Sequence, residues 1–213
     1  MHLGVMTPTR KKGLTRKKVA PRSKKSPPKA KKPAPKGAAR PATAKLVPDV
    51  DRLISELQRQ HDGDPWHGPS RAAILADVSA AEAAWQPGAG AHSIWENVLH
   101  MRSWTREVER RALGGYPAMP ADGDWPHVID TSEKAWTQAQ ASLDAAHDQI
   151  VAVVRRLGGT KLAEHVGATK KHPNGTGITI RAMLYSLASH DVYHSGQVSL
   201  LKRLARAALE VTS

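Results

Sequence analysis

The chain of 213 residues has room for one ordinary domain and an additional segment, and it carries a formal net charge of +13. It contains no cysteine, which excludes disulfides, thiolate metal sites and a cysteine nucleophile, and it fits a cytoplasmic protein. The chain has no run of about 18 apolar residues, so no membrane-spanning helix is predicted. No apolar segment follows the basic N-terminus, so a secretory signal is not indicated.

The positive charge is concentrated at the N-terminal end of the chain. Residues 1–48 hold 15 of the 32 Lys and Arg, 8 of the 15 prolines and no acidic residue. The remainder has 17 basic and 19 acidic side chains. A segment with few large apolar residues, strong self-repulsion and many prolines cannot bury a core. We therefore expect a disordered basic tail over residues 1–47 and a folded domain over residues 48–213.

The composition of this tail resembles that of histone-like proteins. Lysines and arginines that neutralise phosphates release counterions, which gives salt-sensitive binding without sequence preference. The tail has no aromatic residue that would stack on single strands. One hypothesis is therefore a nucleic-acid-associated protein that binds DNA through residues 1–45, with the folded domain as a non-catalytic module. The alternative is a solvated tail without a partner.

Helical periodicity begins directly after the tail. Apolar residues recur at helical spacing between residues 47 and 63, and Gly63 ends this pattern. A second, alanine-rich helix is predicted over residues 71–85, with Ser70 as its N-cap and Pro87 beyond its end.

Two capping signatures predict the starts of longer helices. Ser93 and Glu96 form a capping box ahead of a periodic apolar pattern that Gly114 ends. Asp130 and Glu133 repeat the signature before the next periodic segment.

That next helix is predicted over residues 134–157 and is closed by Gly158 and Gly159. The last helix is predicted to run from about residue 179 to about residue 209. No convincing strand pattern is present. Four long helices, a shorter one and long links predict an all-α four-helix bundle with crossover connections.

The most informative residues are His190 and His194, which lie one turn apart on the last helix. They fall within an apolar stripe formed by Met183, Leu187, Val198, Leu201 and Ala205. A buried imidazole needs partners for its nitrogens, and two on one helix face can share a metal ion. The spacing taken alone is also common in helices without metal.

His100 is the predicted third ligand. It lies in the second turn of the capped helix, and in a bundle metal ligands come from facing helices. Three imidazoles leave an open coordination position for water or substrate. The alternative for His100 is an ordinary half-buried histidine.

Three further residues are candidates around this site. Gln197 follows His194 on nearly the same face and can position a bound ligand, unless it lies on the surface. Glu96 and Asp191 can orient an imidazole, or serve only as a cap and as an ion-pair partner, respectively. The remaining histidines are predicted to be solvated or locally bonded: His61, His67, His92, His127, His147, His165 and His172.

Four segments resemble signatures of the DinB/YfiT-like superfamily: WHGPS at 66–70, HSIWENVLHMRSW at 92–104, GDWP at 123–126 and HDVYHSGQVSLLKR at 190–203. The resemblance covers about residues 48–209. It implies a DinB-type four-helix bundle, often dimeric, with His100, His190 and His194 at the ligand positions of a divalent metal site. The members of this superfamily include mycothiol-dependent enzymes and thiol S-transferases that use bacillithiol. The resemblance therefore implies a low-molecular-weight thiol as partner.

The resulting hypothesis is a metal-dependent enzyme that activates a thiol or water, as a thiol S-transferase or a hydrolase. Three imidazoles accept zinc or nickel, which we expect first, and also iron. We expect a small-molecule substrate, no membrane contact and, by the resemblance, a homodimer. The competing hypotheses are the DNA-binding tail and a bundle whose metal is structural.

Overall fold

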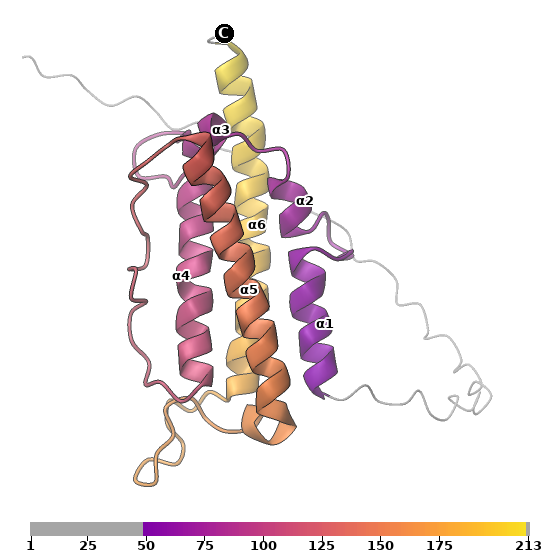
Figure 1. The fold of residues 1–213 in the computed structure, drawn as a ribbon, viewed down its shortest axis with the longest axis vertical. Helices are drawn as coiled ribbons and strands as arrows, with labels where there is room; N and C mark the ends of the chain where they lie inside the picture. The colour runs from indigo at the N-terminus through magenta and orange to yellow at the C-terminus, as the bar shows by residue number, and fades with distance from the viewer. Residues whose placement is uncertain (1–48, 212–213) are drawn as a thin grey trace, which may run out of the picture. The chain divides into compact units, whose positions relative to one another are not determined.

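The computed structural model describes residues 49–211, and the predicted basic tail over residues 1–47 lies outside this range. Regular structure within the described residues is helical, apart from one isolated antiparallel bridge between His165 and Thr179. The helices (Figure 1) are α1 (Asp49–His61), α2 (Arg71–Leu75), α3 (Ala80–Ala84), α4 (Ile94–Ala112), α5 (Glu133–Leu162) and α6 (Ile180–Val211).

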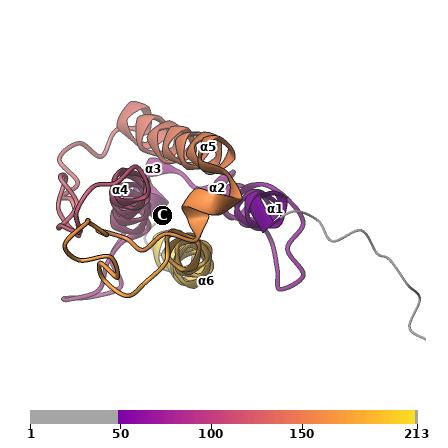
Figure 2. The same cartoon turned by 90° about the horizontal axis from the view of Figure 1, so that it is seen from below.

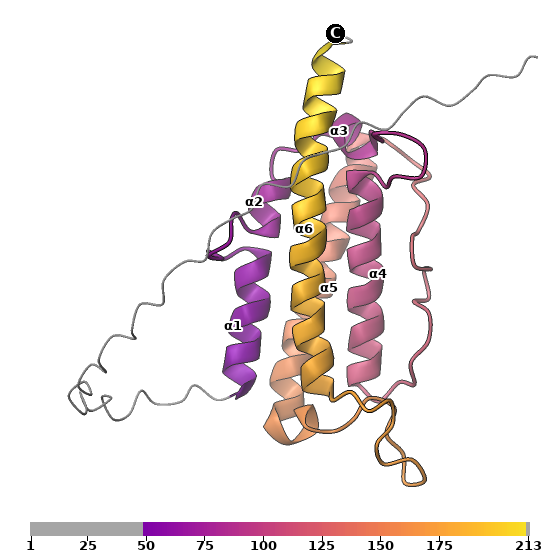
Figure 3. The ribbon, with the colours of Figure 1, turned by 180° about the vertical axis from the view of Figure 1, so that it is seen from behind.

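The four long helices α1, α4, α5 and α6 form a bundle, as predicted. Seen from below, α5 and α6 lie across from each other, with α4 on one side and α1 on the other (Figure 2). From behind, α6 runs between α1 and α4 (Figure 3). The connection over residues 113–132 returns along the outside of the bundle, so that α4 and α5 run in the same direction (Figure 1). This connection is the predicted crossover.

The predicted capping box of α4 is confirmed. Ser93 Oγ accepts a hydrogen bond from the Glu96 backbone N–H at 3.1 Å, and Glu96 Oε2 accepts from the Ser93 backbone N–H at 2.8 Å. The cap fixes where α4 starts and therefore sets the position of His100 two turns further along.

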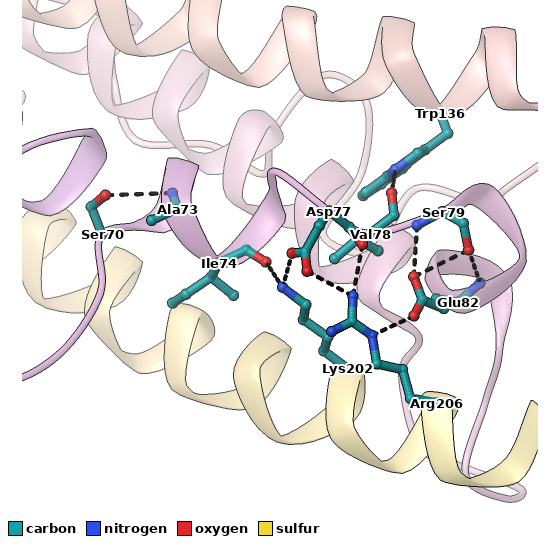
Figure 4. A network of polar contacts seen from close by, with 10 residues as sticks. All are labelled: Ser70, Ala73, Ile74, Asp77, Val78, Ser79, Glu82, Trp136, Lys202 and Arg206. Carbon is teal, nitrogen blue, oxygen red and sulfur yellow. Dashed lines mark hydrogen bonds and ion pairs between the residues drawn. The ribbon is translucent and has the colours of Figure 1, made fainter. Parts of the chain in front are cut away.

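The prediction of a single helix over residues 71–85 is wrong, because the chain forms two separate helices there, α2 and α3. Ser79 starts α3 with a second capping box that includes Glu82. Figure 4 shows that tertiary partners hold the break: Arg206 bonds the Asp77 carbonyl at 2.7 Å, and the Trp136 indole N–H donates to the Val78 carbonyl at 2.6 Å. These long-range bonds replace the helical hydrogen bonds that the break gives up.

The boundaries of α5 also differ from the prediction. Ser132, and not Asp130, is the N-cap, because Ser132 Oγ accepts from the Ala135 backbone N–H at 3.2 Å. Asp130 instead accepts from the Ser132 backbone N–H at 2.8 Å. At the other end Gly158 adopts φ 68°, which kinks the chain, but a further helical turn continues to Leu162.

The core consists of two apolar clusters along the bundle. The first joins α1, α4, α5 and the first half of α6 around Leu53, Ile150 and Leu184. The second joins α3, α4, α5 and the second half of α6 around Trp136 and Val198. The predicted histidine pair lies on α6 between these clusters. No helix in this part of the chain combines the length and the apolar character needed to span a bilayer.

Candidate metal centre

The structure brings together the three histidines singled out in the sequence. His100 comes from α4, and His190 and His194 come from α6. One ligand nitrogen from each ring lies within 4.8 Å of the other two. The side chains of His100 and His194 are buried, and His190 is half-buried. The capped start of α4 and the register of α6 therefore place three imidazoles at one point between the helices.

Hydrogen bonds to Nδ1 fix the tautomers of two of these rings. His100 Nδ1 donates to the backbone carbonyl of Asp124 at 2.7 Å, because a carbonyl can only accept. His194 Nδ1 donates to Asn97 Oδ1 at 2.8 Å, and the Asn97 amide donates in turn to the Ser93 carbonyl at 2.8 Å. Both rings therefore keep a lone pair on Nε2, the atom that can bind a cation.

His190 completes the cluster. Its Nε2 lies 3.0 Å from Nε2 of His100, whereas its buried Nδ1 has no hydrogen-bond partner among the described residues. The Nε2 atoms of His100 and His194 are acceptors at the centre of this cluster. Imidazole nitrogens held about 2.0–2.1 Å from one ion lie roughly 3 Å apart. The separation of His100 Nε2 and His190 Nε2 matches that value, and the ligand nitrogen of His194 lies within 4.8 Å of both, so the three donors are close enough together to be candidates for one divalent cation.

The surroundings keep these imidazoles neutral. Burial is the main cause that lowers the pKa of His190 to about 4, and the neighbouring His194 and His100 add to it. Burial and His100 lower the pKa of His194 to about 4, against a hydrogen bond with Gln197 that acts in the other direction. Burial also lowers the pKa of His100. Neutral imidazoles are the form that binds metal.

The crossover connection supplies one wall of the site. The Trp125 ring is stacked between two histidine rings. Its centroid lies 3.5 Å from that of His92, with 4° between the ring planes, and 3.9 Å from that of His100, with 15° between the planes. Next to it, Asp124 Oδ1 accepts a hydrogen bond from the Trp104 indole N–H at 2.6 Å and lies 3.2 Å from His100 Nδ1. The crossover therefore holds the position of His100 both through a backbone carbonyl and through ring stacking.

A cavity of about 780 Å³ opens over the three histidines. Gln197 lines it, as the predicted pocket position requires, together with Asn97, Trp104, Trp125, Tyr193, Leu200 and Leu201. A neighbouring apolar cavity of about 180 Å³ shares Trp104 and His190 with it. The arrangement thus combines three candidate ligands with room for a small molecule.

Comparison with known families agrees with this geometry. A family model described as the DinB superfamily matches residues 70–198, which include all three histidines. This match spans more than half of the chain. The chain belongs to the DinB superfamily. No curated protein and no solved structure shows significant similarity to it.

In this DinB superfamily member, Glu96 and Asp191 make the contacts of a cap and of an ion-pair partner, respectively. Glu96 Oε2 caps α4 and also accepts a hydrogen bond from the Gln86 amide at 3.0 Å. Asp191 is buried and accepts from Arg71 Nη1 at 2.7 Å. Glu96 also lies 3.7 Å from His92 Nδ1, so its partners are a helix start, an amide and a histidine, whereas the partner of Asp191 is an arginine.

The groups that orient the imidazoles of the DinB-type site were missed from the sequence. Asn97 lies on the apolar face of α4 between Ile94 and Met101, and a polar residue on such a face needs a partner. Asp124 and Trp125 belong to a segment that carries the family resemblance, but nothing in the sequence places that segment against α4.

The interpretation of His147 as solvated or locally bonded is wrong. Its side chain is 4% exposed, and its ring is stacked on that of His61 at 4.0 Å. The buried Arg71 bonds His61 Nδ1 at 2.8 Å. This second polar cluster shares α6 with His190 and His194, where Asp191 directly follows His190, and it joins α1, α2, α5 and α6.

Proposed function

We propose that this DinB superfamily protein binds one divalent metal ion through His100, His190 and His194 and activates a low-molecular-weight thiol. The observation that carries the proposal is the convergence of three neutral imidazoles with their Nε2 atoms inward. Three protein ligands leave a coordination position for substrate, which is the arrangement of catalytic rather than structural sites.

The bound ion supplies acidity, since it lowers the pKa of a coordinated thiol or water toward neutrality. The protein's own groups do the rest. The Asp124 carbonyl and Asn97 hold the rings in the ligand tautomer, and the apolar walls restrict water around the activated sulfur. Gln197 lies where its amide can orient a bound molecule. Water as the nucleophile, in a hydrolase, is the alternative at the same site.

The donor set favours zinc or nickel in this proposal. Imidazole is a borderline ligand that suits zinc, copper, nickel and iron, whereas magnesium and calcium prefer oxygen donors. Iron remains compatible with three imidazoles and an open position.

Metal analysis of protein prepared without a His-tag tests the proposal. We expect about one transition-metal ion per chain, as for a catalytic site with three protein ligands. The double variant His190→Ala/His194→Ala should hold almost none, while the exposed His127→Ala should bind as the parent chain does. Equal and negligible metal in all three proteins would contradict the site.

Turnover requires a separate assay, in which a low-molecular-weight thiol is conjugated to an electrophile with and without a chelator. A chelator-sensitive rate that the double variant lacks would support thiol activation. If the protein binds metal but does not change the rate, the proposal of a thiol transferase is contradicted and the proposal of a metal site stands.

A second candidate function rests on the tail, where 15 Lys and Arg occur without one acidic residue in residues 1–48. We propose that residues 1–45 bind DNA through its phosphates. Affinity for duplex DNA should fall steeply between 50 and 200 mM salt, by about 10³-fold or more if six or more phosphates are contacted. Removal of residues 1–45 should abolish binding. If the truncated chain binds equally well, the tail is not the cause.

A further inference from the structure

We infer that the cavity over the three histidines selects a ligand whose body is uncharged and largely apolar, with its single anionic group at the metal ion. The inference rests on the proposed metal site and narrows its substrate class. The inference predicts that the cavity binds neutral thiols and related metal-binding molecules more tightly than thiols that carry additional carboxylates.

The lining of the cavity provides the first argument. Among the described residues that line it, none is lysine or arginine. Its walls are formed by Trp104, Trp125, Tyr193, Leu200 and Leu201, and its uncharged polar groups belong to Asn97 and Gln197. Apolar and aromatic walls with a few amides suit a neutral molecule.

Charge provides the second argument. The one carboxylate at this cavity, Asp124, is held in place by the Trp104 indole. The basic side chains of the described lining are the imidazoles of His92 and of the three candidate ligands. A ligand carboxylate would therefore meet a like charge and no lysine or arginine. Burying an anion without a partner is unfavourable.

The arginines around the site are already engaged. Arg111 lies 5.5 Å from the centre of the Trp104 ring, but its Nε donates to Glu107 at 2.7 Å and its Nη2 donates to the Ala118 carbonyl at 2.7 Å. Arg71 is committed to Asp191 and His61. Both guanidinium groups are thus already bound to acceptors of the protein itself.

The test compares matched probes on the cobalt(II)-loaded full-length chain. One pair is phenylmethanethiol and 4-(sulfanylmethyl)benzoic acid, and the other is benzohydroxamic acid and its 4-carboxy derivative. Dissociation constants come from the change in cobalt absorption on titration. We expect the uncharged member of each pair to bind at least about tenfold more tightly, because the added carboxylate finds no cation.

Two lysine variants on α6 provide the matched comparison. Leu200 lines the cavity and is 51% exposed, whereas Leu204 is 43% exposed and does not line it. Neither leucine belongs to the two apolar core clusters, so we expect both positions to accept a lysine. Leu200→Lys should reduce the preference for the neutral probe at least about threefold by placing a cation at the cavity. Leu204→Lys should leave the preference unchanged.

The outcomes separate this inference from the proposed function. Equal or tighter binding of the carboxylated probes, or identical effects of the two variants, would overturn the inference while the metal site stands. Hydroxamate preference without thiol binding would support the inference and contradict the thiol chemistry. A chain that takes up no cobalt would overturn both.

Discussion

Asn97 shows how much of the site depends on a single uncharged side chain. It is 2% exposed, and it links the Ser93 carbonyl at the start of α4 to His194 on α6. The capping box that starts α4 thereby also fixes the tautomer of an imidazole on another helix. His100 is oriented in the same way by a backbone carbonyl, so neutral acceptors hold both rings.

Replacing Asn97 tests this arrangement at the scale of one residue. Asn97→Leu preserves the side-chain volume but leaves His194 Nδ1 without its acceptor, so metal affinity should fall about 10- to 100-fold. Asn97→Asp keeps an acceptor and should retain metal binding. Competition with a chromophoric chelator measures the affinity, and the exposed Asn174→Leu is the control. If the metal affinity of Asn97→Leu is unchanged, Asn97 does not orient His194 for metal binding.

At the scale of the elements, a second polar cluster connects four helices. Arg71 of α2 bonds Asp191 of α6 and His61 of α1, and His61 stacks on His147 of α5. Burial, with His61 and Arg71 as further causes, lowers the pKa of His147 to about 3. Since arginine only donates, His61 Nδ1 accepts and His61 is neutral.

This depressed pKa predicts a pH dependence of stability. Below pH 6.5 the unfolded chain protonates His147 while the folded chain does not, so stability is lost as the pH falls from about 6.5 toward 3. The free energy of unfolding that His147 contributes falls by up to about 1.4 kcal/mol per pH unit in this range. His147→Leu should unfold with a shallower pH dependence than the parent chain in urea titrations at pH 7.5 and 5. His172→Leu, an exposed position, should show the parent's slope.

The element boundaries show which parts of the fold local sequence controls. The capping box of α4 was predictable, because its donors and acceptors lie within three residues. The break between α2 and α3 was not, since Trp136, Lys202 and Arg206 stabilise it from distant positions in the chain. Helical propensity in the alanine-rich segment yields to these tertiary bonds.

For the whole molecule, the bundle and its crossover act together on the site. Burial raises the pKa of Glu107, but hydrogen bonds from Arg110 and Arg111 outweigh it and lower the pKa to about 2. The same carboxylate accepts from the Ala118 backbone N–H at 3.1 Å, which anchors the start of the crossover to α4. Further along, Trp125 stacks on His100. An ion held by the three histidines would therefore join α4, α6 and the crossover.

Metal should accordingly stabilise the folded chain. Binding to the native state at a free concentration 100 times the dissociation constant adds about 2.7 kcal/mol, equivalent to roughly 5–10 °C in Tm for a domain of this size. Thermal unfolding with zinc or nickel and with excess chelator measures the shift. The His190→Ala/His194→Ala variant should show none, and an equal shift there would place the stabilising metal elsewhere.

The sequence by itself determined the helical bundle and the three histidines, because 3.6-residue periodicity, caps and i, i+4 spacing are local properties. Only the tertiary structure decided how the imidazoles point. The groups that orient them are the Asp124 carbonyl, 24 residues from His100, and Asn97, 97 residues from His194. Those contacts exist because the crossover and the packing of α4 against α6 bring distant segments together, and no local pattern encodes that approach.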